Sequence, residues 1–294
     1  MIATNAAGQA TSPATHLEVN QGPAIAFVGA WGDDVANQCT VSPAATAPCA
    51  IAAGAFHGLA LNADGTVAAW GKNSDLRANV PPTATNIVAI AAGGAHSLAL
   101  RDDGSVIAWG RNWDGQTNVP PAATNVVAVA AGCIHSLALR ADGTVVAWGN
   151  DDYGQASASF LALDVVAISA GYYHNMALRA DGTVGTWGLD YPTPANATNL
   201  VAVAAGWEHC LALRSDGSVI AWGDNSYGQS AVPVSATNVV SIAAGYFHNL
   251  ALRADGTVVI WGKGYLSVTN VPGGLRKVAA ISAGEQNNLG LQKD

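Results

Sequence analysis

The chain contains 294 residues, and half of them are hydrophobic, so a large core can be buried. Charged residues make up only 11%, while glycine (33) and tryptophan (9) are abundant, which favours an all-β protein rich in tight turns. The net charge of −8 argues against nucleic acid as a partner, because binding to phosphates requires clustered lysine and arginine.

The N-terminal segment differs from the rest of the chain. Residues 2–20 resemble the final hairpin of a bacterial immunoglobulin-like domain, a kind of domain typical of secreted multidomain proteins. We therefore predict that residues 1–22 are the remnant of a preceding domain or a linker. We also predict a bacterial protein that is secreted or lies at the cell surface. The longest uncharged stretch, which includes residues 40–61, is broken by prolines and glycines, so no membrane-spanning helix is expected.

From residue 23 onward the chain is a tandem repeat. A Trp-Gly pair recurs with spacings of 39, 39, 39, 39, 35 and 39 residues, at Trp31, Trp70, Trp109, Trp148, Trp187, Trp222 and Trp261. An Ala-Gly-x-x-His motif recurs in phase with it, at His57, His96, His135, His174, His209 and His248. A seventh copy of that motif carries Asn287 in place of the histidine. Asp-Gly pairs lie between the two motifs, and a period of this length is typical of propellers and solenoids.

Each repeat predicts strands rather than helices. Its apolar runs are five to seven residues long and rich in valine and isoleucine, and the Asp-Gly step between two runs predicts a type I′ hairpin turn. Three or four short strands per repeat make one propeller blade. The last copy ends two strands into a blade, at residues 289–292, and residues 25–28 supply the missing third strand. We therefore predict that residues 23–294 form an all-β, seven-bladed β-propeller, closed by pairing of the N- and C-terminal strands in one shared blade.

These repeats resemble those of the regulator of chromosome condensation family. Residues 114–120 (D-G-Q-T-N-V-P) and 127–132 (V-A-V-A-A-G) are also similar to the linker between blades in the propeller-type β-lactamase inhibitory proteins of actinobacteria. The resemblance covers residues 24–294 and implies the propeller fold. For the inhibitors it also implies that aromatic and acidic residues just before each repeat histidine bind the partner. Exchange factors of the family act through an inserted wedge, for which a spacing of at most 39 residues leaves no room.

The strand directions place two sets of loops on one face of the disc, which we call the Trp-Gly face. This face holds the two residues before each repeat histidine and the loop after each Trp-Gly pair. Of the 13 aromatic residues that are not repeat tryptophans, 11 fall in these loops. Ten of the 20 acidic residues also fall there, against four basic residues, for a local balance near −6.

The aromatic residues of these loops vary from blade to blade, whereas scaffold residues repeat. Such rings either cap the disc by packing between loops or serve an interface, where tyrosine and tryptophan contribute about 2 kcal/mol or more each. The variation favours an interface. We predict a partner-binding site composed of Phe56, Trp113, Asp114, Asp152, Tyr153, Tyr172, Tyr173, Tyr191, Trp207, Glu208, Tyr227, Tyr246, Phe247 and Tyr265.

Three functions are compatible with this face. The first is a protein-binding module, whose sharpest version inhibits a secreted enzyme such as a β-lactamase and associates with a basic partner in a salt-dependent way. The second is a carbohydrate-binding or cell-surface adhesion module in which the rings stack on sugars. The third, an enzyme, is disfavoured because no catalytic triad, carboxylate pair or phosphate-binding loop stands out. We expect a monomer that is not an enzyme and needs no cofactor.

Histidines and cysteines suggest structural roles. The repeat histidines lie on separate blades, so three cannot converge on one metal ion, and we expect each ring to hydrogen-bond backbone between blades. The repeat tryptophans are expected to pack between sheets. Cys39 and Cys49 both depart from the repeat within one connection, which suggests a disulfide, with reduced thiols as the alternative. Cys133 and Cys210 are expected to stay unpaired.

Overall fold

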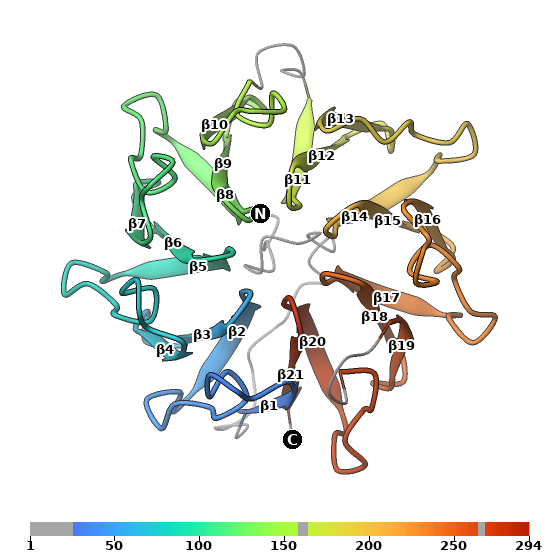
Figure 1. Cartoon of the computed structure of the whole chain (residues 1–294), viewed down its shortest axis with the longest axis horizontal. Helices are drawn as coiled ribbons and strands as arrows, with labels where there is room; N and C mark the ends of the chain where they lie inside the picture. Colours follow the sequence, from blue (N-terminus) through green and yellow to red (C-terminus); the bar gives the residue numbers. More distant parts are fainter. Residues whose placement is uncertain (1–25, 158–163, 264–267, 294) are drawn as a thin grey trace.

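The computed structural model describes residues 26–157, 164–263 and 268–293, and in them the chain forms seven sheets of three antiparallel strands. The sheets are arranged radially around a central axis, like the blades of a propeller (Figure 1). No helix occurs in these described residues. The predicted all-β, seven-bladed fold is therefore confirmed, with three strands in every blade.

In the first six blades the strand nearest the axis comes first in the sequence. Blades 1 to 3 consist of β2 (Pro48–Ala53), β3 (His57–Asn62) and β4 (Val67–Gly71); β5 (Ile87–Ala92), β6 (His96–Arg101) and β7 (Val106–Gly110); and β8 (Val126–Ala131), β9 (His135–Arg140) and β10 (Val145–Gly149). Blades 4 to 6 consist of β11 (Val165–Ala170), β12 (His174–Arg179) and β13 (Val184–Gly188); β14 (Leu200–Ala205), β15 (His209–Arg214) and β16 (Val219–Gly223); and β17 (Val239–Ala244), β18 (His248–Arg253) and β19 (Val258–Gly262). The closing blade consists of β20 (Val278–Ala283), β21 (Asn287–Lys293) and β1 (Ala26–Gly32).

The closing blade joins the two ends of the described chain. β1 pairs antiparallel with β21, which places Trp31 opposite Asn288, and β21 pairs with β20 on its other side. A strand from the N-terminal part of the chain thus completes a C-terminal sheet. This is the predicted closure, and because the ring is closed every blade has a neighbouring blade on each side.

The Asp-Gly turns differ in type from the prediction. A type I′ turn needs a positive φ at both central residues. In blade 2 only Gly104 has one, with φ of 80°. Its backbone N–H donates to Arg101 O (3.1 Å), and the Asp103 carboxylate accepts a hydrogen bond from the Ser105 backbone N–H (2.9 Å). The connection is therefore a tight turn followed by a left-handed glycine, a second common hairpin geometry that the same dipeptide fits.

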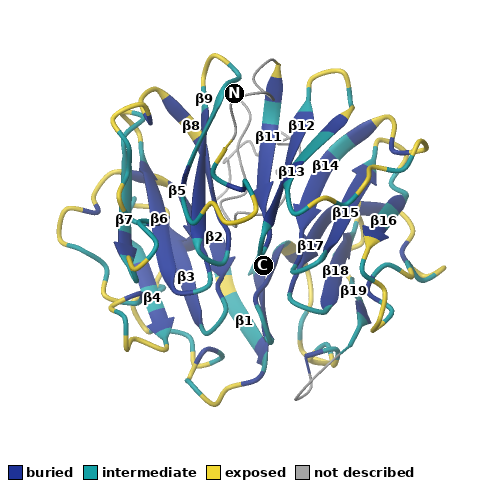
Figure 2. Cartoon of the chain, turned by 45° about the horizontal axis from the view of Figure 1, so that its top comes forward, coloured by how far each residue is buried: buried dark blue, intermediate teal, exposed yellow. Residues whose placement is uncertain are grey.

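The hydrophobic core lies between the blades. Every residue of β3 is buried, because neighbouring sheets cover both faces of a middle strand, as the dark blue strands of Figure 2 show. The outer strand of a blade buries mainly its tryptophan, as in β7, where Trp109 is 7% exposed. Trp109 and Trp148 belong to one apolar cluster that extends through blades 1 to 3. The repeat tryptophans thus pack between sheets, as predicted.

A repeated chain of hydrogen bonds ties each blade to the next. His57 Nε2 lies 2.9 Å from Ser97 Oγ, Ser97 Oγ donates to Arg77 O (3.0 Å), and Trp109 Nε1 donates to that same oxygen (2.8 Å). Because the serine proton is engaged, the neutral histidine donates from Nε2. Asn175 takes the place of the serine beside His135. The predicted direct bond from histidine to backbone is therefore wrong: a polar side chain of the next blade lies between them.

Glycines close the ring near the axis. The backbone N–H of Ala55 donates to Gly93 O (3.2 Å), and that of Gly94 donates to Gly132 O (3.1 Å). A Cβ atom on Gly93 would lie only 2.5 Å from Gly132 O. The repeated glycine of the Ala-Gly-x-x-His motif is therefore required by close approach of neighbouring blades.

The four cysteines are free thiols, so the predicted disulfide between Cys39 and Cys49 is corrected. Cys39 lies in the loop after β1, where its Sγ donates to Asp33 O (3.1 Å). Cys49 lies at the start of β2, close to Asp64 of the Asp-Gly turn at the opposite end of the blade. The chain between the two cysteines crosses from one face to the other, which keeps the sulfurs apart. Residues 1–22 lie outside the described residues, and their assignment as a domain remnant stays a prediction.

Candidate functional site

The two loop sets of the Trp-Gly face lie directly against each other. In every blade the residue after the Trp-Gly pair donates its backbone N–H to the residue preceding the repeat histidine, or preceding Asn287 in the closing blade. Examples are Lys72 N to Phe56 O (2.8 Å) and Leu189 N to Tyr173 O (2.8 Å). The variable residues of both loop sets therefore share one surface, as the strand directions predicted.

Seven aromatic side chains on this face touch in a continuous row, which we call the aromatic ridge. Neighbouring ring centroids in the row are 3.2 to 5.2 Å apart. Blades 3 to 6 contribute the rings, from both loop sets. In spatial order they are Tyr153, Tyr173, Tyr172, Trp207, Tyr246, Phe247 and Tyr227.

The rings of the ridge cover one another in part. Those at the two ends are exposed, Tyr153 by 48% and Tyr227 by 39%, and the five between them are half-buried. Tyr172 stands edge-on to Tyr246, with an interplanar angle of 78°. Trp207 Nε1 is buried and has no hydrogen-bond partner among the described residues. The ridge thus caps the disc by packing between loops, and its rings stay partly exposed at the surface, where an interface would need them.

The predicted aromatic residues outside the ridge have other surroundings. The Arg111 guanidinium lies 3.8 Å from the ring centroid of Trp113, which is 79% exposed. Phe56 lies beneath Lys72 Nζ, 5.3 Å from its ring centroid. Tyr265 falls outside the described residues.

Tyr191 belongs to the scaffold of the shortened repeat. Its ring packs edge-on against His174, at 4.9 Å between centroids, and its carbonyl accepts the Trp222 Nε1–H (3.3 Å). That carbonyl takes the place held in four of the other loops by the carbonyl of a buried glutamine, such as Gln229. The structure therefore separates Tyr191 from the ridge with which the sequence grouped it.

The predicted acidic residues flank the ridge. Asp114 and Asp152 both accept hydrogen bonds from the Asn150 side-chain amide, at 3.3 and 3.0 Å, and this orders the loop that carries Tyr153. Glu208 is half-buried next to Trp207. These carboxylates make the rim of the ridge acidic.

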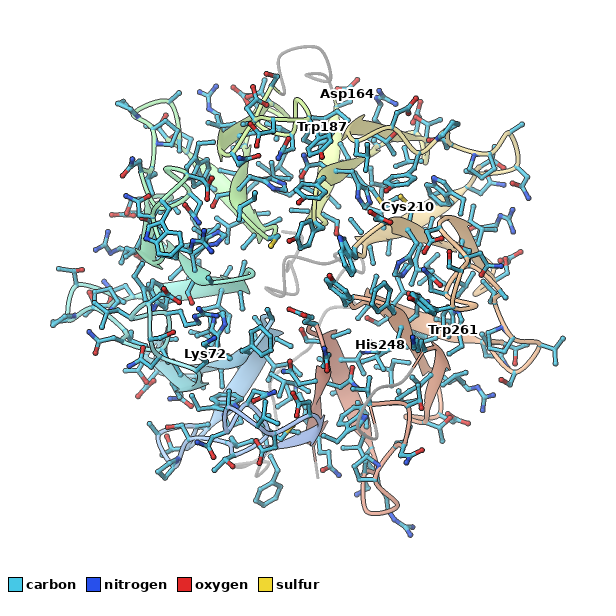
Figure 3. All side chains as sticks on the ribbon, in the orientation of Figure 1. Lys72, Asp164, Trp187, Cys210, His248 and Trp261 are labelled. Atoms are coloured by element: carbon cyan, nitrogen blue, oxygen red, sulfur yellow. The ribbon has the colours of Figure 1, made fainter. Side chains whose placement is uncertain are left out.

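A pocket of about 420 Å³ lies beside the ridge on the same face. Lys72, Arg77 and Arg111 line it together with two carboxylates, those of Asp75 and Glu285. Figure 3 places Lys72 over blade 1, across the central axis from Cys210. Sequence reasoning counted these cations only in a charge balance. The available signal was a departure from the repeat, because arginine at position 77 stands where four of the other loops have glutamine.

The buried histidine and cysteine side chains are poorly suited to catalysis. Burial lowers the pKa of His174 to about 3 and raises the pKa of Cys210 well above its usual range. Cys210 Sγ lies 3.3 Å from His174 Nε2 and thus replaces the serine or asparagine of the other inter-blade contacts. A buried, protonated thiol is not a nucleophile. In the described part of the chain, no three histidine, cysteine or acidic residues are grouped to hold a metal ion.

The fold and this face define a class of protein: a propeller with one Trp-Gly repeat per blade and its variable residues on one face. The family model described as the regulator of chromosome condensation (RCC1) repeat matches residues 49–75, 87–116, 126–155, 165–191, 200–229 and 239–266. The chain therefore belongs to the RCC1-repeat family. No curated protein matches it in sequence.

Solved structures agree on the fold. Prp20p from Saccharomyces cerevisiae, described with its binding properties to Gsp1p and histones, is similar with a TM-score of 0.74, 19% identity and 92% coverage of both chains. The structure of Kap60 bound to yeast RCC1 (Prp20) gives a TM-score of 0.77 and 18% identity, with 100% of this chain and 94% of that chain covered. Human WBSCR16 gives a TM-score of 0.69 and 20% identity, with 91% of this chain and 98% of that chain covered. At such identities the likeness shows the fold alone. No helix long and apolar enough to span a membrane occurs in residues 26–157, 164–263 or 268–293.

Proposed function

We propose that this chain is a non-catalytic protein-binding propeller whose aromatic ridge, with the acidic loops around it, holds a protein partner. The observation that carries the proposal is the continuity of the ridge. Seven rings from four blades, at positions that differ from blade to blade, meet in one surface. Tyrosine and tryptophan concentrate binding energy in protein interfaces. Prp20p, which shares the fold, binds Gsp1p and histones.

The charge of the face favours a basic partner. Ten acidic residues against four basic ones fall in its loops. Opposite charge on a partner accelerates encounter and fixes orientation, and salt screens this attraction. We therefore expect association that slows as salt rises.

The arrangement of the rings favours a protein over a carbohydrate. A sugar stacks on an open ring face, whereas the ridge rings cover the faces of their neighbours. Lys263 Nζ lies 3.9 Å from the centroid of Tyr227, an exposed end ring of the ridge. The most exposed aromatic ring in the described part of the chain, that of Trp113, is likewise covered on one face by Arg111. Carbohydrate binding is therefore the alternative outcome of the test.

We infer a secreted or cell-surface bacterial setting and a monomeric chain, with a secreted enzyme such as a β-lactamase as the partner class. The support is the similarity of residues 114–120 and 127–132 to the propeller-type inhibitory proteins. An enzyme cleft suits a ridge with half-buried sides and exposed ends. In such a complex the ridge would cover the enzyme's active site without reacting.

The test compares immobilised wild-type protein with two variants against purified secreted proteins and polysaccharides. Trp207→Ala removes a central ring of the ridge, and Phe27→Ala, a 54% exposed ring on β1, is the matched control. We expect a protein ligand that Trp207→Ala weakens at least about a hundredfold and Phe27→Ala does not change. Binding of polysaccharides only, at a rate independent of salt, would support the carbohydrate alternative instead.

A further inference from the structure

Small residues open the pocket beside the ridge. Around the ridge the two positions before the repeat histidine hold large side chains, such as Tyr172 and Tyr246. In blades 1 and 2 these positions include Ala55, Gly94 and Ala95, and all three line the pocket of about 420 Å³. Tyr172 and Tyr246 form the facing wall. The pocket and the ridge therefore share two rings and make one continuous surface.

The loop beneath this pocket breaks the repeat. Its Arg77 replaces a buried glutamine whose side-chain oxygen accepts a backbone N–H of its own loop; those glutamines are Gln38, Gln116, Gln155 and Gln229. Arg77 is 4% exposed, donates to Gly94 O (3.1 Å) in the next blade and pairs with Asp75. Leu76 has a φ of 60°, a conformation that residues other than glycine rarely adopt. The equivalent residues Asn37, Gly115, Gly154 and Gly228 also have a positive φ, so this backbone conformation belongs to the loop type and only the leucine departs from it.

Two further cations face the pocket. The Arg111 guanidinium lies on Trp113, and its Nε is buried with no hydrogen-bond partner among the described residues. Lys72 lies over Phe56. Asp75 pairs with Arg77 and also interacts with Arg111, so the pocket holds three cations and two carboxylates, those of Asp75 and Glu285. The pocket is thus locally positive on a face that is otherwise acidic. We call it the cationic pocket.

We propose that the cationic pocket receives an acidic side chain of the protein partner, a glutamate or aspartate next to an apolar residue, and so fixes the partner's orientation on the ridge. This inference rests on the proposed function. Arginine forms strong charge-assisted bonds with carboxylates, and the pocket volume lies in the usual range for a bound group. Apart from Lys263 at the Tyr227 end of the ridge, the basic residues of this face line the pocket, so the pocket attracts an acidic side chain and selects the register of the partner.

The test titrates ¹⁵N-labelled protein with three acetylated and amidated dipeptides: Phe-Glu, its neutral match Phe-Gln, and Phe-Lys. The NMR signals of the Trp113 indole N–H and the Arg111 Nε–H report on the pocket. We expect Phe-Glu to shift both signals and Phe-Gln to bind about tenfold more weakly. Phe-Lys should leave both signals in place. Equal affinity for Phe-Glu and Phe-Gln, or no shift with any dipeptide, overturns the inference.

Two variants sharpen the result. Arg77→Gln introduces the residue that four of the other loops have, and Arg111→Gln removes a cation that is only half-buried. Each should weaken Phe-Glu about tenfold while the amide spectrum stays that of a folded chain. Arg140→Gln, on the opposite face beside Asp142, is the control and should change nothing. If the folded Arg111→Gln variant binds Phe-Glu as tightly as the wild type does, the inference that this pocket binds an acidic side chain is wrong. If no dipeptide binds but partner binding still depends on Trp207, the pocket inference alone falls and the proposed function stands.

Discussion

Mild acid should unfold this propeller through its buried histidines. Burial holds the pKa of His57, His96 and His174 at about 3 and that of His135, His209 and His248 at about 4. In the unfolded chain the same groups titrate near their usual pKa of about 6.5. The fold therefore favours the neutral form. The resulting stability is fully present above about pH 6.5 and is lost as the pH falls toward the folded values.

The size of the effect follows from the difference in proton binding. Between about pH 7.5 and about pH 5.5 each histidine lowers the free energy of unfolding by slightly more than 1 kcal/mol, because only the unfolded chain becomes protonated. If the six contributions add, the total is about 8 kcal/mol, which is comparable to the whole stability of a typical protein. Most carboxylates titrate below this window, so the histidines dominate it.

Urea unfolding followed by tryptophan fluorescence at three pH values measures this slope. The matched variants are His57→Asn and His96→Asn, because the closing blade already carries asparagine at this position: oriented to donate, the Asn287 amide reaches Gly54 O and Ala55 O at 3.1 and 3.2 Å. Each substitution should reduce the pH slope by about one sixth, whatever it does to stability at neutral pH. A stability that is equal at the two ends of the window, or a double variant with the wild-type slope, would refute the reasoning.

Three further predictions concern the scaffold. Gly93→Ala should cost about 3 kcal/mol in urea unfolding, because its Cβ would lie 2.5 Å from Gly132 O, whereas Gly273→Ala, in open space, should be neutral; equal effects would contradict the axial packing. Leu76→Gly should raise the melting temperature by relieving a left-handed leucine that costs about 1 kcal/mol, and a lower melting temperature would show that the leucine side chain stabilises the loop. A thiol reagent should label exposed Cys49 in the native protein but buried Cys210 only after unfolding. A reductant should not alter the melting temperature, and a loss of stability on reduction would instead support a disulfide between Cys39 and Cys49.

The fold could be predicted because each blade repeats the same information. The spacing of the Trp-Gly pairs and the strand-length apolar runs predicted the blades. The incomplete first and last copies predicted that strands from the two ends share one blade, and β1 indeed pairs with β21. What failed was finer geometry. The dipeptide Asp-Gly does not distinguish two hairpin turns, and a spacing of ten residues does not reveal that Cys39 and Cys49 lie at opposite ends of a blade.

The candidate site could be predicted in composition but not in arrangement. Variation at repeated positions drew attention to Tyr172, Trp207 and Tyr246, yet only the folded structure shows that their rings touch. Tyr191 looked equivalent in sequence, but the shortened repeat turns it onto His174. The cationic pocket was not predicted from the sequence, because it forms where the small residues Ala55 and Gly94 lie and no motif marks such a position.

The measurement that tests the account most directly is a titration of this protein into class A β-lactamases while a chromogenic β-lactam is hydrolysed. The account predicts tight inhibition of at least one enzyme, in the nanomolar range, lost in the Tyr172→Ala/Trp207→Ala variant and retained in Phe27→Ala. Inhibition that survives removal of both ridge rings would contradict the ridge as the binding surface, and absence of inhibition at micromolar protein across the panel would contradict β-lactamases as the partner.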